Sequence, residues 1–278
     1  MQVGIFAKTF PRPTLDESLD AAASSGVEAI QFNLALTGGP SLPEAVPAGL
    51  AAHVKAATGA RALDMAAVSG TYNMAHPDAA VRADGRQRIA AIIAAAPALG
   101  TTVVTVCTGS RDSEDMWRHH PENASPEAWA DMLESLTGAL EVAEAHDVTL
   151  GVEPEHNNVV DSAAAARRLL DELQSPHVKI VVDAANLIAP GTLGRQDRTL
   201  REAFSLLGED LVLAHAKDVD RNGEVVAAGR GALDYALYAD LLRQARFDGA
   251  LVLHGLAEED VPGSVAFVRS AVDRAATA

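Results

Sequence analysis

Short apolar runs alternate with longer segments of mixed polarity along the whole chain. In eight of the runs nearly every residue is apolar, which is typical of strands buried on both faces. Each run is followed by a segment with the three- and four-residue apolar spacing of a helix, and several of these segments end at a glycine. The predicted strands are 3–6, 27–33, 62–68, 102–107, 148–153, 178–183, 211–215 and 250–254, and the predicted helices are 14–25, 43–58, 80–99, 125–146, 161–173, 197–207, 232–245 and 258–275.

This regular alternation predicts one architecture. Strand–helix repeats favour a parallel sheet, and the number eight favours a sheet closed into a barrel. The 278 residues suffice for one such barrel, which typically needs about 250 residues. We therefore expect a single (β/α)8 TIM barrel, with one domain covering residues 1–278.

Four predicted strands end in a side chain that can bind a metal ion. Glu153, Asp183, His215 and His254 each follow an apolar run directly. In a parallel barrel these strand ends share one face, where active sites lie. Taken singly, each residue favours capping or ion pairing, but the four together favour metal binding. For His254 the alternative is a rim histidine that donates to a backbone carbonyl.

Further polar residues follow these strand ends closely. Lys217 lies two residues after a candidate ligand and either polarises a substrate oxygen or pairs with Asp218 or Glu155. Glu155 and His156 follow the first ligand, and one of them either contacts substrate or caps a helix. Arg221 either reaches a sugar hydroxyl or is a solvated loop charge, and solvation is favoured.

The longest predicted loop lies between residues 108 and 125. Loops of this length are usually functional or disordered, and its tryptophan and paired histidines argue against disorder. Trp117 and His119 are candidate substrate contacts, and His120 is a candidate acid/base residue. Such a loop can fold over the barrel mouth and exclude water. The alternative is an ordinary surface loop.

Composition excludes some classes of partner. The formal net charge is −16, which disfavours nucleic acid because an acidic surface repels phosphates. Cys107 is the one cysteine, so an internal disulfide cannot form. No apolar run is long enough to span a membrane, and the chain starts directly in a predicted strand. We expect a cytoplasmic protein without membrane contact.

The motifs at the strand ends carry a resemblance. They are Gly-Val-Glu-Pro-Glu at 151–155, Val-Asp-Ala-Ala-Asn at 182–186, His-Ala-Lys-Asp at 215–218, Gly-Arg-Gly-Ala-Leu-Asp at 229–234 and Leu-Val-Leu-His at 251–254. In this order the chain resembles the xylose isomerase-like barrel superfamily over nearly its whole length. That group includes sugar isomerases, ketose 3-epimerases, inositol-catabolism enzymes and endonuclease IV. The resemblance implies a divalent metal held by Glu153, Asp183, His215 and the residue ending the eighth strand.

The chain departs from this family at two positions. His254 stands where the family usually has glutamate, and Asn186 stands where many members have histidine. In family epimerases the first and last ligands are both glutamates that move protons, so the two-glutamate mechanism does not carry over. Two imidazoles shift metal preference away from magnesium. We expect manganese, with zinc, iron, cobalt or magnesium as alternatives.

The resemblance implies a metal-dependent isomerase or epimerase of a sugar or keto-sugar derivative. The shared chemistry is proton abstraction next to a carbonyl, with Glu153 as ligand and base and Lys217 as electrophile. One alternative is a lyase on 3-keto-glycosides, including C-glycosides, because elimination needs one base and one acid. Another is a barrel that binds a sugar without turnover. Barrels of this family often pair, which allows a homodimer or a hetero-oligomer.

Overall fold

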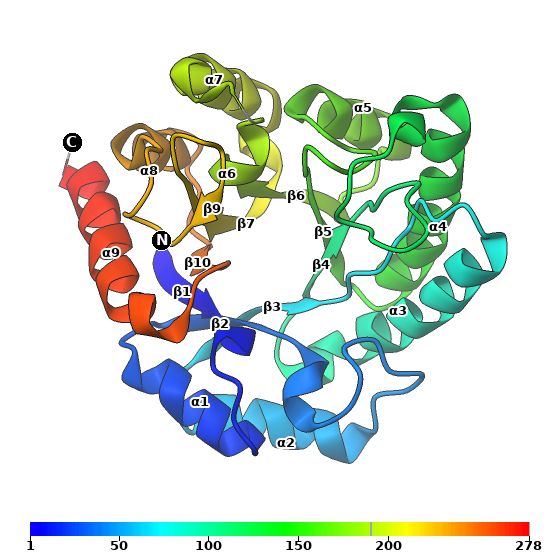
Figure 1. The fold of residues 1–278 in the computed structure, drawn as a ribbon. Helices are drawn as coiled ribbons and strands as arrows, with labels where there is room; N and C mark the ends of the chain where they lie inside the picture. Colours follow the sequence, from blue (N-terminus) through cyan, green and yellow to red (C-terminus); the bar gives the residue numbers. More distant parts are fainter. Residues whose placement is uncertain (190, 278) are drawn as a thin grey trace.

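The computed structural model describes residues 1–189 and 191–277, and in that part of the chain eight parallel strands close into a barrel (Figure 1). Around the barrel the strands follow the order β1, β10, β7, β6, β5, β4, β3 and β2. Their bounds are β1 Gln2–Phe6, β2 Ala29–Phe32, β3 Asp64–Ser69, β4 Val103–Cys107, β5 Thr149–Glu153, β6 Val178–Asp183, β7 Leu211–Ala216 and β10 Ala250–Leu253.

Helices surround the barrel and cover the outer faces of its strands (Figure 1). They are α1 Leu15–Ser24, α2 Ala48–Gly59, α3 Ala79–Leu99, α4 Pro126–Ala145, α5 Ala163–Leu173, α7 Gln196–Leu207, α8 Tyr235–Gln244 and α9 Val261–Thr277, with one short extra helix, α6 Ala184–Leu187. None of the helices in the described ranges combines the length and the apolar character needed to cross a bilayer.

The predicted (β/α)8 TIM barrel is confirmed, with differences in detail. The prediction that α2 begins at residue 43 is wrong. The helix begins at Ala48, because Pro47 adopts an extended conformation as its N-cap. The structure also adds a hairpin of β8 Asp218–Val219 and β9 Val225–Val226, in a stretch that the pattern left as a loop.

Side-chain alternation along the strands aims the site residues into the barrel. A separate buried apolar cluster includes Val181 on β6 and Leu213 on β7. Asp183 and His215 follow these residues by two positions, and side chains two apart on a strand share a face. The candidate ligands therefore stand directly above this cluster, at the carboxyl end of the barrel.

A glycine in α3 shows how tightly the helical layer packs. A Cβ added at Gly85 would overlap the ring of Tyr72, which lies in the loop after β3. We expect Gly85→Ala to lower the free energy of unfolding by about 1–3 kcal/mol, because overpacking outweighs the better helix propensity of alanine. Gly49→Ala in α2 meets no atom within 4 Å and should be neutral or stabilising by about 0.5 kcal/mol. Urea unfolding of both variants would contradict this account if Gly85→Ala matched Gly49→Ala.

Candidate metal centre and substrate cavity

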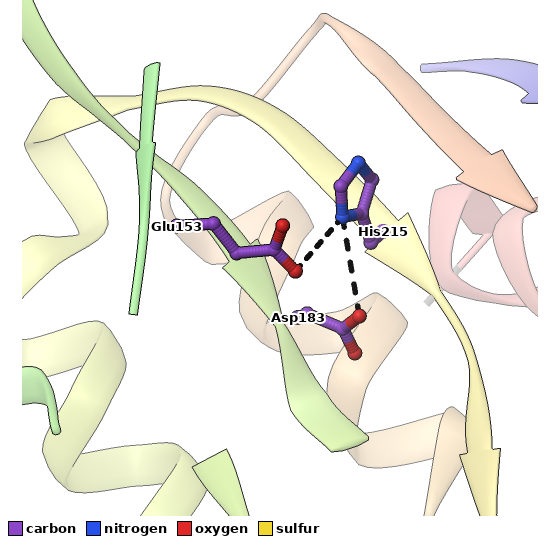
Figure 2. A group of neighbouring side chains, drawn as sticks. All are labelled: Glu153, Asp183 and His215. Carbon is purple, nitrogen blue, oxygen red and sulfur yellow. Dashed lines mark hydrogen bonds and ion pairs between the residues drawn. The ribbon is translucent and has the colours of Figure 1, made fainter. Parts of the chain in front are cut away.

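Three metal-binding side chains converge at the carboxyl end of the barrel. Glu153, Asp183 and His215 come from β5, β6 and β7, and one ligand atom from each lies within 4.8 Å of the others. His215 Nδ1 lies 3.0 Å from Glu153 Oε1 and 3.9 Å from Asp183 Oδ2. Figure 2 shows this nitrogen turned toward both carboxylates, while the other ring nitrogen points away. All three residues are buried.

The contacts of Asp183 indicate whether this group of side chains suits a metal ion. Its Oδ1 caps α6 by accepting from the Ala185 amide at 2.9 Å, whereas the buried Oδ2 accepts no hydrogen bond. Lys217 Nζ lies 3.1 Å from this oxygen and forms an ion pair with it. A buried carboxylate oxygen that faces a second carboxylate and an imidazole nitrogen fits a divalent cation.

Asn186, in α6 directly after β6, forms hydrogen bonds with two groups of the centre. Its Nδ2 donates to Glu153 Oε1 at 2.6 Å, and its Oδ1 accepts from Lys217 Nζ at 2.7 Å. The amide therefore links the candidate base to the buried ammonium group.

Charge, more than burial, sets the protonation of these groups. Burial alone would lower the pKa of Lys217, but Asp183, Glu153 and Glu155 raise it well above its ordinary value. Burial alone would raise the pKa of Glu153, but His215 and Lys217 hold it below its ordinary range. The centre therefore keeps an ammonium group beside ionised carboxylates.

A cavity of about 480 Å³ opens above this centre. It has the size typical of sites for small organic ligands. Its lining comprises Phe6, Lys8, Gln31, Asn33, Ser41, Ser69, Thr71, Thr105, Cys107, Met116, Trp117, Glu153, Glu155, Asn186, His215, Lys217 and His254.

Glu155 lies in the lining of this cavity. Burial raises its pKa to about 7, and although Lys217 opposes this shift, the charges of Glu153 and Asp183 add to it. His156 is half-buried behind it, with Nδ1 3.4 Å from Glu155 Oε1, and does not belong to the cavity lining. Of this predicted pair, the glutamate is therefore the one in a position to meet substrate.

His254 lies beside the three ligands rather than among them. Its ring centroid is 5.1 Å from that of His215 and 5.5 Å from that of Phe6. Burial lowers its pKa to about 3, helped by His215 and Lys217, so the imidazole is neutral near pH 7. The group of mutually close ligand atoms found among the described residues does not include it, and a fourth ligand at this position stays a prediction.

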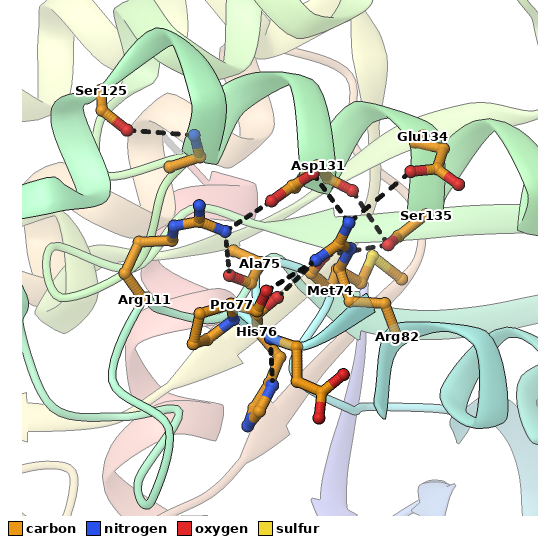
Figure 3. Close-up of polar contacts among 12 residues, drawn as sticks. Met74, Ala75, His76, Pro77, Arg82, Arg111, Ser125, Asp131, Glu134 and Ser135 are labelled. Carbon is orange, nitrogen blue, oxygen red and sulfur yellow. Dashed lines mark hydrogen bonds and ion pairs between the residues drawn. The ribbon is translucent and has the colours of Figure 1, made fainter. Parts of the chain in front are cut away.

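The long loop after β4 brings Trp117 to the cavity and is fixed at its base. Figure 3 shows Asp131 of α4 accepting from Arg82 at 2.7 Å and from Arg111 at 2.6 Å. The same arginines donate to backbone carbonyls of the loop after β3, at His76 (2.8 Å) and Ala75 (3.2 Å). These contacts tie two loops to one helix.

The remaining predicted contacts lie elsewhere. His119 is exposed, and His120 caps a short 3-10 helix, its Nδ1 accepting from the Glu122 amide at 3.3 Å. Neither residue belongs to the cavity lining. Arg221 is exposed and borders a separate cavity of about 260 Å³ formed by the loops after β6 and β7. The structure does not bring these three residues to the candidate metal centre.

Three residues of the cavity lining, Gln31, Thr105 and Lys8, are not among those that the strand-end pattern predicts. Gln31 is a polar residue inside the apolar strand β2, and a polar residue in such a strand is a sequence signal for a site residue. Asp218 has a structural role: it accepts hydrogen bonds from the backbone amides of Gly229, Gly231 and Leu233.

Sequence comparison identifies the family. Residues 19–271 match the family described as xylose isomerase-like TIM barrel. The chain belongs to this family. No curated protein matches the sequence.

Solved structures share the fold at low sequence identity. A D-tagatose 3-epimerase-like protein is 15% identical with a TM-score of 0.79, covering 100% of this chain and 99% of its own. The 3-keto-D-glucoside 4-epimerase of E. coli is 21% identical with a TM-score of 0.75, and the match covers 97% of this chain and 99% of the epimerase chain. The IolI protein with a bound zinc atom is 15% identical with a TM-score of 0.74, and the match covers 100% of this chain and 98% of the IolI chain.

Metal affinity should distinguish the three candidate ligands from acidic residues on the surface. We expect calorimetric titration with Mn²⁺ to give about one ion per chain, and Glu153→Gln or Asp183→Asn to weaken binding more than about 100-fold, beyond the loss expected for an outer contact. Mn²⁺ at 100 times its Kd should stabilise the unaltered protein by about 2.7 kcal/mol. Glu134→Gln, on the exposed side of α4, is the matched control. Equal affinity in all four proteins would contradict a centre at these residues.

Proposed function

We propose that this protein is a divalent-metal-dependent isomerase or epimerase of a sugar or keto-sugar derivative, removing a proton next to a carbonyl. The observation that carries the proposal is the convergence of Asp183 Oδ2, a buried oxygen in an ion pair with Lys217, with Glu153 and His215 beneath a cavity of small-molecule size. Family membership and the epimerases with the same fold support sugar chemistry as the reaction class.

A divalent ion held by Glu153, Asp183 and His215 would polarise a substrate carbonyl and stabilise the negative charge that develops beside it. We favour manganese, because two carboxylates and an imidazole suit it, although the zinc of IolI keeps zinc as an alternative.

Glu153 is positioned to move the proton. Its Oε1 is engaged by Asn186 and faces His215, whereas Oε2 has only a 3.8 Å contact with Cys107 Sγ. Cys107 lines the cavity, so Oε2 lies on the substrate side. A carboxylate with one oxygen fixed and the other directed to the cavity can take a proton from a bound sugar and return it.

Lys217 supplies positive charge where a substrate oxygen would become negative. Its ammonium group lines the cavity, is fixed by Asn186 and Asp183, and has its pKa raised by the surrounding carboxylates. A fixed cation that needs no reorganisation during the reaction stabilises developing charge more than a mobile one.

The position of the acids favours a lyase as a second candidate. The carboxylates in the cavity lining, Glu153 and Glu155, both come from the end of β5. The opposite side presents Phe6, Lys8 and His254, so a proton cannot be returned there by a carboxylate. Acids on one side of the cavity suit an isomerisation that moves the proton on one face of the substrate. They also suit elimination from a keto-glycoside, a compound class similar to the substrate named for the keto-glucoside epimerase.

Deuterium incorporation tests this proposal. The Mn²⁺-loaded protein would be incubated in deuterium oxide with a panel of ketoses and 3-keto-glycosides and followed by proton NMR. We expect deuterium at a carbon next to the carbonyl, with at least a 1000-fold slower rate in Glu153→Gln, since removing the base or an equivalent group costs several kcal/mol. Glu134→Gln should exchange at the normal rate.

The products separate the candidates. A rearranged sugar indicates an isomerase or epimerase, and a released aglycone indicates a lyase. Metal binding without exchange or product from any substrate in the panel would contradict the proposed chemistry and favour a barrel that binds sugar without turnover.

A further inference from the structure

Gln31 connects three strands through the interior of the barrel. Its Oε1 lies 2.7 Å from His215 Nε2, and its Nε2 donates to Thr105 Oγ1 at 3.0 Å. The three residues belong to β2, β7 and β4, which are not neighbours in the barrel order. Their exposed fractions are 4%, 2% and 3%, so all three side chains are buried.

This contact selects one form of His215. A carbonyl oxygen accepts and does not donate, so the hydrogen bond to Gln31 Oε1 places a proton on His215 Nε2. With a metal ion at Nδ1, the imidazole would keep this proton on Nε2. Nδ1 is the nitrogen that faces Glu153 and Asp183 in Figure 2.

Thr105 holds the end of the Gln31 amide that faces away from the histidine. With Nε2 bonded to the hydroxyl, Oε1 is left for the imidazole. The backbone supports this orientation, because the pairing of β2 with β3 shifts register between Ile30 and Gln31. A bulge of this kind re-aims a side chain and is common beside active sites.

We propose that Gln31, held by Thr105, is a positioning residue that fixes the tautomer and ring orientation of His215 for metal binding through Nδ1. This inference rests on the metal centre of the proposed function. Outer partners of metal-bound histidines commonly set metal affinity in this way, and their loss costs 10–100-fold.

Metal affinity is the first test. Calorimetric titration with Mn²⁺ should show a Kd about 10–100-fold weaker in Gln31→Met, which keeps the side-chain length and removes the acceptor. Thr105→Val should give a smaller loss, and Thr105→Ser should restore the affinity of the unaltered protein. In Gln31→Met, adding Thr105→Val should cause no further loss, because the two residues act as one unit. Thr58→Val, a buried threonine in α2, is the matched control and should change nothing.

The second test reads the tautomer of the metal-bound imidazole directly. In protein labelled with ¹⁵N-histidine, the His215 signals are assigned by their absence in His215→Asn. Loaded with Zn²⁺, the unaltered protein should show the metal on Nδ1 and the proton on Nε2, and Gln31→Met should move population to the form with the proton on Nδ1. A purely structural role for Gln31 would change stability without changing this ratio.

The outcomes are distinct. If the unaltered protein binds no Mn²⁺ or Zn²⁺, the metal centre fails and this inference fails with it. If the protein binds metal but Gln31→Met and Thr105→Val bind equally well, or the tautomer ratio stays unchanged, only this inference is overturned. Should Gln31→Met not fold, the loss in Thr105→Val and its rescue in Thr105→Ser decide the matter.

Discussion

The structure depends on placing two carboxylates in the interior at one end of a barrel. Glu153 and Asp183 are buried, and an isolated buried charge is expensive. Lys217 balances them, reaching Asp183 directly and Glu153 through Asn186. Removing either sign of charge would leave the other buried without compensation. This requirement explains why the polar residues at the strand ends form one connected network.

Geometry places that network where a substrate can reach it. Side-chain alternation puts Asp183 and His215 on the inner faces of β6 and β7, above an apolar interior cluster. The loop after β4 then brings Trp117 to the cavity, and the contacts of Asp131 with two arginines hold that loop in place. The cavity therefore has a network of buried polar residues at its base and apolar side chains in part of its remaining lining.

The sequence predicted the strands and the convergence of four side chains because both follow from local rules, and the structure groups three of the four, Glu153, Asp183 and His215. An apolar run predicts a buried strand, and a parallel barrel gathers strand ends on one face. Contacts across the barrel follow no such rule. The link from Gln31 to His215 joins β2 to β7, and nothing near residue 31 in the sequence indicates it. Loop conformation was also beyond local rules, so His120 was predicted to act in catalysis but caps a 3-10 helix outside the cavity lining.

The central claim is that a metal ion belongs among Glu153, Asp183 and His215. Crystals soaked in Mn²⁺ and measured at the manganese absorption edge would locate the ion directly. The account predicts one strong anomalous peak in contact with both carboxylates and with His215 Nδ1, and with Lys217 Nζ outside its coordination sphere. A peak elsewhere, or fully ordered ligands with no peak at saturating Mn²⁺ or Zn²⁺, would contradict it.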